Sequence, residues 1–144
     1  MATPGGNPEY LKGAEEFASQ ATLLSPGAIQ SWQTLAQASI LRRNSAQAIA
    51  AYDKCIELRP NVPTYHLARA DLLLIDGQIE QASAALDHIE SLFGQTIDST
   101  LIRVRFLVLS GRKDEGIILL GQCRQRAPQH PRVIQLSREL MGQP

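Results

Sequence analysis

Two cysteines and three histidines are the residues of this chain best suited to bind a metal or to act as nucleophiles. His66, His88 and His130 have no histidine four residues away and no cysteine or carboxylate at the spacing of a zinc site. The glycines are isolated turn formers apart from Gly5-Gly6, so no glycine-rich loop is available to hold a phosphate. Serine, histidine and aspartate occur, but nothing in their spacing brings them together as a catalytic triad. We therefore predict a protein that is not an enzyme and holds no metal and no cofactor.

The composition excludes further classes of function. The 144 residues carry 14 basic and 14 acidic side chains, and 44% of them are apolar but only 5% aromatic. Such a chain folds as a soluble unit, because disordered chains are poor in apolar residues and rich in net charge. Zero net charge and few aromatic rings argue against duplex and single-stranded nucleic acid. With short apolar runs and no signal sequence, we expect a cytoplasmic protein with no membrane partner, unless this is a piece of a longer exported one.

The elements that carry these residues repeat with a period of 34. Small residues recur at Ala14, Ala48, Ala82 and Gly116, and chain-breaking residues at Pro26, Pro60, Gly94 and Pro128. Each unit predicts two helices, with Ser45 as an N-cap, Pro63 in a first helical turn and Gly77 in a turn between helices. We expect units at 29–62, 63–96 and 97–130, with helices at 29–42, 45–58, 63–75, 79–92, 97–109 and 113–126.

The remaining residues complete a single domain at 8–141. The segment 8–28 predicts a half unit with one helix from Pro8 to Leu24, and 131–141 predicts a capping helix. Residues 1–7 are expected to form a flexible tail. Within the units, Ala36 and Ala48 are expected where paired helices come closest, because helices approach to about 8–10 Å only where side chains are small.

The cysteines occupy one repeat position two units apart. If repeats stack at about 10 Å, Cys55 and Cys123 lie about 20 Å from each other, whereas a disulfide needs Cα atoms within about 7 Å. We predict two reduced, buried thiols that pack as small apolar side chains.

The first full unit resembles a tetratricopeptide repeat, whose pattern is W-x2-L-G-x2-Y, then A-x3-F, then P in 34 residues. Here the pattern is carried by Trp32, Leu35, Ala36, Ala48, Tyr52, Cys55 and Pro60. The later units are looser, with His66 and Thr100 in the place of the tryptophan and Arg69 and Arg103 in the place of the leucine. We expect these arginines to pack through their stems while the guanidinium reaches water or a carboxylate.

The resemblance implies an all-α fold, a right-handed α-solenoid of antiparallel helix pairs. It also implies a non-catalytic protein–protein interaction module that binds a peptide or helix of a partner in a concave groove. The first helix of each unit lines that groove in this family. Projected onto this sequence, the candidate groove residues are Gln33, Gln37, Ile40, Thr64, Leu67, Asp71, Leu74, Asp98, Leu101, Ile102, Arg105 and Val108.

Two further sets of residues refine the expected mode of partner binding. Leu67, Leu74, Leu101, Ile102 and Val108 form our hypothesis for an apolar contact with the partner, although a neighbouring helix covering some of them is the alternative. The basic clamp with which one subgroup holds the C-terminal tail of chaperones is absent. Its places hold Gln33, Gln37, Ala68, Asp98 and Ile102.

The alternative function is structural. The half unit leaves apolar residues such as Phe17, Leu23 and Leu24 without a preceding helix, which favours self-association into a homo-oligomer, scaffolding, or an origin in a larger multidomain protein. The charge is also uneven, with 6 basic and 10 acidic side chains in residues 1–96 but 8 and 4 in residues 97–144. The basic end favours an acidic partner segment, and salt would weaken that attraction.

Overall fold

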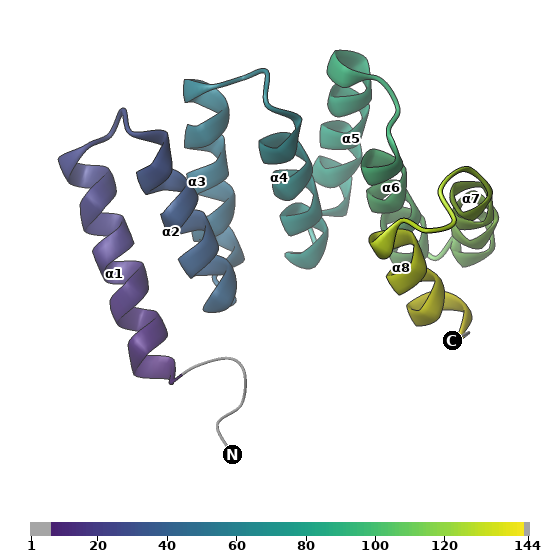
Figure 1. Cartoon of the computed structure of the whole chain (residues 1–144), viewed down its shortest axis with the longest axis horizontal. Coiled ribbons are helices and arrows are strands. Elements are labelled where there is room, and N and C mark those ends of the chain that lie inside the picture. Colours follow the sequence, from purple (N-terminus) through teal and green to yellow (C-terminus); the bar gives the residue numbers. More distant parts are fainter. Residues whose placement is uncertain (1–6, 143–144) are drawn as a thin grey trace. The chain divides into compact units, whose positions relative to one another are not determined.

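A computed structural model describes residues 7–142, and within them the chain consists of helices joined by short turns (Figure 1). The helices are α1 (Pro8–Leu24), α2 (Ile29–Leu41), α3 (Ser45–Leu58), α4 (Pro63–Ile75), α5 (Ile79–Phe93), α6 (Ile97–Leu109), α7 (Lys113–Arg126) and α8 (Pro131–Met141). Each begins and ends within one residue of the position expected from the period. Residues 1–6 of the predicted tail lie outside the described residues, while Asn7 caps α1 through its side chain.

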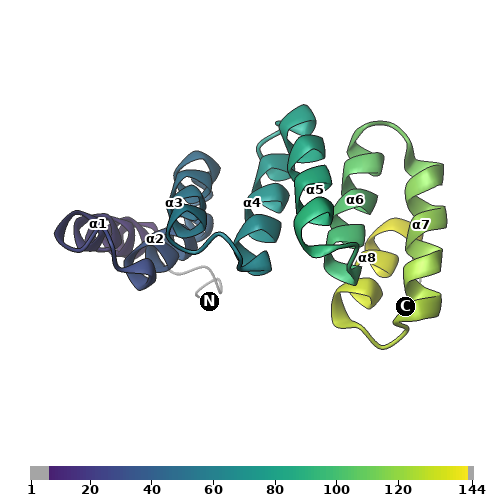
Figure 2. The same ribbon diagram turned by 90° about the horizontal axis from the view of Figure 1, so that it is seen from above.

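The helices group into two compact units that meet in sequence between Asp76 and Gly77. In the first unit α1 packs on α2, α2 on α3 and α3 on α4, in the order of the chain (Figure 2). In the second unit α5 packs on α6, α6 on α7 and α7 on α8, and α8 also reaches back to α6. The boundary falls in the turn of the second predicted repeat, 63–96, so its two helices belong to different compact units. The single domain at 8–141 stays a prediction.

The turns within repeats use one backbone device. Gly77 and Gly111 adopt φ values of +79° and +80°, the left-handed conformation that ends a helix and that glycine adopts without steric cost. Arg43 lies 34 residues before Gly77 and takes the same conformation at φ +58°. The helix that follows, α3, is capped by Asn44, whose side-chain oxygen accepts from the backbone N–H of Gln47 at 3.2 Å. The prediction that Ser45 is the N-cap was therefore wrong by one residue.

Small residues lie where the period places them in the core. Ala36, Ala48, Ala70 and Ala82 are fully buried. In the first unit, Trp32 and Tyr52 pack against two core clusters, one of which contains Ala36. The second unit has its own core of buried residues from α6, α7 and α8, which are Leu101, Val104, Leu120, Cys123, Val133 and Leu136. Cys55 and Cys123 are free and buried, which confirms the prediction of two reduced thiols.

A buried carboxylate fixes the leading helix. Glu15 of α1 is buried, and its side chain pairs with the guanidinium of Arg42, the C-cap of α2. Its other oxygen accepts from the side-chain amide of Asn44, the N-cap of α3, at 3.2 Å. One side chain of α1 thereby engages the residues that end one helix and begin the next. The half unit is an integral part of the first compact unit.

Candidate binding faces on the first helices of the repeats

The first helices of the repeats in the first unit, α2 and α4, carry seven of the twelve candidate groove residues. One of them, Leu74, is buried, and we call the surface formed by the other six the α2/α4 face. It consists of Gln33, Gln37, Ile40, Thr64, Leu67 and Asp71. Gln37, Ile40 and Thr64 are exposed, and Gln33, Leu67 and Asp71 are half-buried. The structure therefore leaves all six residues at least partly open to solvent.

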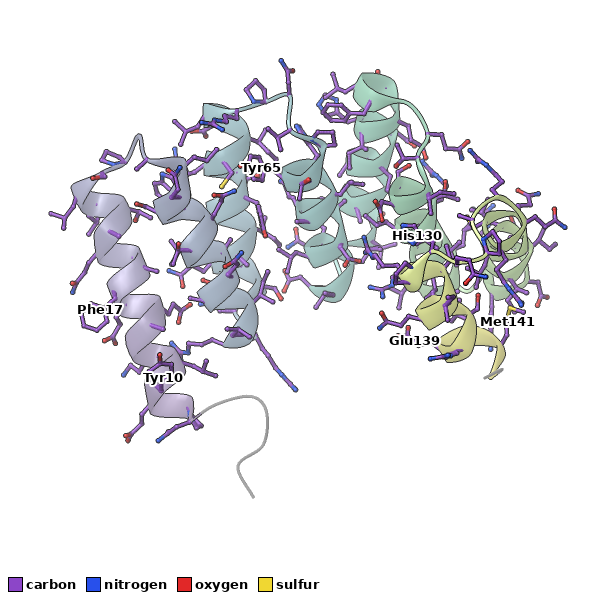
Figure 3. The ribbon with its side chains drawn as sticks, viewed as in Figure 1. Tyr10, Phe17, Tyr65, His130, Glu139 and Met141 are labelled. Carbon is purple, nitrogen blue, oxygen red and sulfur yellow. The ribbon has the colours of Figure 1, made fainter. Side chains whose placement is uncertain are left out.

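A hydrogen bond across the repeats orders this face. The side-chain amide nitrogen of Gln33 on α2 donates to the phenol oxygen of Tyr65 on α4 at 2.8 Å. Tyr65 is buried, and its ring lies 6.4 Å from the ring of Tyr52 at an angle of 37°. Figure 3 labels Tyr65 beside α3 at the top of the first unit. Because Tyr65 is held by the core, this hydrogen bond restrains the side chain of Gln33.

Glutamines form a row along α2. Gln30 and Gln37 are exposed on either side of Gln33, at the i, i+3, i+7 spacing that puts side chains on one side of a helix. A carboxamide presents both a hydrogen-bond acceptor and two donors and carries no charge. The row is therefore suited to a ligand that offers peptide groups, which have one donor and one acceptor each. Sequence reasoning placed Gln33 and Gln37 in the groove but gave the glutamines no chemistry of their own.

The first helices of the second unit, α6 and α8, form a different surface. Arg132 of α8 pairs with Asp98 of α6 at 3.0 Å, so the two side chains that occupy equivalent repeat positions neutralise each other. Arg105 and Val108 are half-buried, and Asp71 of the first unit and Arg105 each already have an interaction partner. This face presents paired charge where the α2/α4 face presents neutral amides.

Three of the apolar candidates do not lie on any surface. Leu74, Leu101 and Ile102 are buried among the core residues. Leu101 packs in the cluster shared by α6, α7 and α8. The structure therefore does not support direct contact of these three side chains with a partner. Neighbouring helices cover Leu101. Leu67 and Val108 remain half-buried.

Sequence reasoning did not extend the candidate positions to α8, which it treated only as a cap. Arg132, Gln135 and Glu139 follow Asp98, Leu101 and Arg105 by 34 residues each and are exposed. Gln135 and Glu139 are joined by a hydrogen bond of 3.0 Å, and Glu139 is labelled on α8 in Figure 3. One further step of the period would have found them.

The two arginines at the leucine position pair with the preceding helix, as expected. Arg69 donates to Asp53 at 2.5 Å. Arg103 donates to Asp87 and Glu90 at 3.0 Å each. Burial by itself would lower the pKa of Arg103, but the hydrogen bonds to Glu90 and Asp87 outweigh it and raise the pKa. Both arginines hold helices together and present no free charge to a ligand.

The residue types considered above for metal binding do not form a metal site in the described part of the chain. His66 is buried, with Nε2 2.7 Å from the carbonyl oxygen of Pro60. Within residues 7–142, no three side chains among His, Cys, Asp and Glu are placed to share a metal ion. Over the same residues, each helix is too short or too polar to cross a bilayer.

Known proteins resemble the chain in one repeat and in the fold. Residues 29–62 match the family model of the tetratricopeptide repeat. A thermophilic tetratricopeptide-repeat protein of Thermus thermophilus has 16% identity and a TM-score of 0.71, over 94% of this chain and 75% of that one. PilF of Pseudomonas aeruginosa has 22% identity and a TM-score of 0.62, over 91% of this chain and 60% of that one. The chain thus spans less than two thirds of PilF.

At 16% and 22% identity, the similarity to these solved structures establishes the fold only. The search of curated proteins gave no significant match. Residues 29–62 are thus a tetratricopeptide repeat, and the chain shares the all-helical fold of a tetratricopeptide-repeat protein along nearly its whole length.

Proposed function

We propose that this protein is a non-catalytic interaction module and that its α2/α4 face binds an extended segment of a partner protein. Tetratricopeptide repeats serve as protein-interaction scaffolds, which supports the general role. The specific proposal rests on one observation, the row of Gln30, Gln33 and Gln37 on α2. The side chain of Gln33, in the middle of the row, is restrained by its hydrogen bond to Tyr65.

The chemistry of this row favours the main chain of an extended ligand. An extended peptide exposes N–H and C=O groups that need partners once water is removed, and carboxamides satisfy both kinds. Charged side chains would select a ligand by its charge, whereas glutamines select a free backbone. Ile40 and Leu67 add apolar surface beside the row for one side chain of the ligand.

The residues at the clamp positions agree with this mode of binding. Gln33 and Gln37 stand where the chaperone-binding subgroup has basic and amide clamp residues, and Asp98 stands at another basic place. A free C-terminal carboxylate would meet no cation on the α2/α4 face. The proposed ligand is therefore an internal extended segment, and a chain end is not required.

A peptide library tests the proposal without a known partner. Random dodecapeptides displayed on phage are selected on the purified protein, and enriched peptides are measured by titration calorimetry. We expect peptides that bind the wild type and lose at least about tenfold in affinity with Gln33→Ala/Gln37→Ala. Backbone NMR shifts caused by the peptide should concentrate on α2 and α4.

The matched control is Gln122→Ala/Gln125→Ala, which removes two exposed glutamines from α7. Its affinity should equal that of the wild type. Equal affinity of the α2 variant, peptides that recognise only a free C-terminus, or no enriched peptide at all would each contradict the proposal.

A further inference from the structure

The leading helix carries a stripe of large apolar side chains on its outer side. Tyr10, Phe17 and Leu24 are 75%, 74% and 85% exposed. They are spaced by seven residues, which is close to two turns, so they lie along one side of α1. Figure 3 labels Tyr10 and Phe17, and Phe17 points away from α2. We call these three residues the α1 stripe.

The repeat shows what this side of a helix does elsewhere. Ala51 of α3 follows Phe17 by one period and is 1% exposed. It is buried in a core cluster with Leu35, Ala36 and Ala38 of α2. In α3 this position therefore faces another helix. α1 instead packs on α2 through a different side, where Glu15, Ala18 and Thr22 are buried.

The occupant of the stripe must be unlike an ordinary first helix. Ala51 allows α2 to approach α3 closely, and paired helices with small contacts lie about 8–10 Å apart. A phenylalanine at the same position would keep a partner helix with small contact residues at a greater distance from α1. The covering surface must pack large residues of its own against those of α1.

A second copy of the stripe meets this requirement, because the sizes of the side chains along α1 are symmetric about Phe17. Tyr10 and Leu24 lie seven residues before and after it, and the small residues Gly13 and Ala21 lie four before and after it. A Cβ built at Gly13 would meet no atom within 4 Å, so the space beside it is open. A surface with such symmetry is self-complementary, which is what a two-fold interface needs.

We propose that two copies of this chain pair through their α1 stripes, with the helices antiparallel and the two-fold axis at Phe17. In this pair Tyr10 of one copy packs against Leu24 of the other, and Gly13 lies at the level of Ala21. The pairing does not depend on the proposed peptide site, since α1 lies outside the α2/α4 face.

A head-to-tail assembly is disfavoured by the opposite end of the described chain. The exposed side chains of α8 are polar or charged apart from Pro131 and include Arg132, Gln135, Arg138 and Glu139. Among the large apolar residues exposed in the described part, none lies on α8. The stripe would find no apolar counterpart there, so a closed dimer is favoured over a filament.

Electrostatics have little influence on the proposed pair. The stripe contains no charged side chain, and the nearby charges of Lys12 and Glu16 face each other at 3.9 Å. Association should therefore change little between low and high salt, in contrast to an attraction between the acidic and basic ends of the chain.

Sedimentation velocity over a range of concentrations gives the first test. We expect the mass to rise with concentration from 15.8 kDa for one chain to twice that value. Phe17→Glu should weaken the association at least about tenfold without loss of helicity, because the side chain is exposed in the single chain. Ile118→Glu, which changes an exposed residue of α7, is the control and should leave it unchanged. A wild type that stays one chain at all concentrations, or equal effects of the two variants, overturns the proposal.

Cysteine cross-linking tests the geometry. The native cysteines are buried, so oxidation should leave the wild type uncross-linked. Phe17→Cys should form a disulfide between two copies, because the axis passes through that position. Tyr10→Cys should cross-link poorly alone but well when mixed with Leu24→Cys. Efficient cross-linking of Tyr10→Cys to itself indicates parallel helices and overturns the antiparallel pair.

Discussion

Trp32 and His66 make the same hydrogen bond from the same place in two successive repeats. Nε1 of Trp32 donates to the carbonyl oxygen of Pro26 at 2.8 Å, and Nε2 of His66 lies 2.7 Å from the carbonyl oxygen of Pro60. Each ring follows its proline by six residues and ties a first helix to the loop before it. Since a carbonyl only accepts, Nε2 of His66 carries the proton.

His66→Phe removes this donor and keeps a planar ring. The carbonyl of Pro60 then loses a partly buried partner, and we expect the free energy of unfolding to fall by about 1 kcal/mol. Urea unfolding followed by circular dichroism measures the change. Thr64→Ala, on the exposed side of the same helix, should stay within about 0.5 kcal/mol of the wild type. If the two variants are equally stable, the hydrogen bond contributes nothing.

The pairing of Arg103 with Glu90 should couple α5 to α6. Both side chains are half-buried, so removing one leaves the other poorly hydrated and unpaired. A double-mutant cycle with Arg103→Met and Glu90→Gln should give a coupling of about 0.5–1.5 kcal/mol. The exposed pair of Arg112 and Glu115 is the comparison, and its cycle should show no measurable coupling. Equal couplings for both pairs would mean that burial does not matter here.

Two glycines of α7 should respond in opposite ways to substitution. A Cβ at Gly116 would lie 3.2 Å from both the carbonyl oxygen of Val104 and a methyl group of Val108, whereas Gly121 has open space. Gly121→Ala should raise the free energy of unfolding by about 0.5–1 kcal/mol through helix propensity. Gly116→Val should lower it by about 1–3 kcal/mol, because α6 must move. Thermal unfolding of both variants decides the matter, and a stabilised Gly116 variant would contradict the close approach.

The buried thiols predict a loss of stability at high pH. Burial raises the pKa of Cys55 and of Cys123 above the usual 9.0. The folded chain keeps these protons to higher pH than the unfolded chain, so the contribution is complete below about pH 9 and is lost as the pH rises through the folded-state values. Urea unfolding at pH 7.5 and at about pH 10 should show the decline.

Cys55→Ala/Cys123→Ala separates the thiols from other groups that titrate at high pH. This variant should be less stable at pH 7.5 but should decline less between the two pH values. Tyr52, whose pKa is also raised by burial, keeps its share of the decline. A variant that declines as steeply as the wild type would show that the thiols play no part.

The helices were predictable because the signals that begin and end them are local. Pro63 and Pro131 lie in first turns, and Gly77 supplies the left-handed conformation that ends α4. The N-cap of α3 was misplaced because Asn44 and Ser45 are both good caps. The left-handed conformation of Arg43 decides between them, and an arginine gives no hint of it.

The candidate site was less predictable because the period identifies a side of a helix but not how closely the next helix covers it. Leu67 and Leu101 hold the same repeat position, yet Leu67 is half-buried and Leu101 lies in a core that includes α8. The bond from Gln33 to Tyr65 depends on the rotamers of both side chains, which spacing does not give.

The position of Glu15 has a consequence for how the first unit comes apart. A terminal helix that touches one neighbour is ordinarily the first to fray, and its amide protons exchange fastest. Here the departure of α1 would strip Arg42 and Asn44 of a shared partner at the point where α2 ends and α3 begins. We therefore expect the leading half repeat to unfold cooperatively with α2 and α3, and its amide protons to exchange at the same rate as theirs.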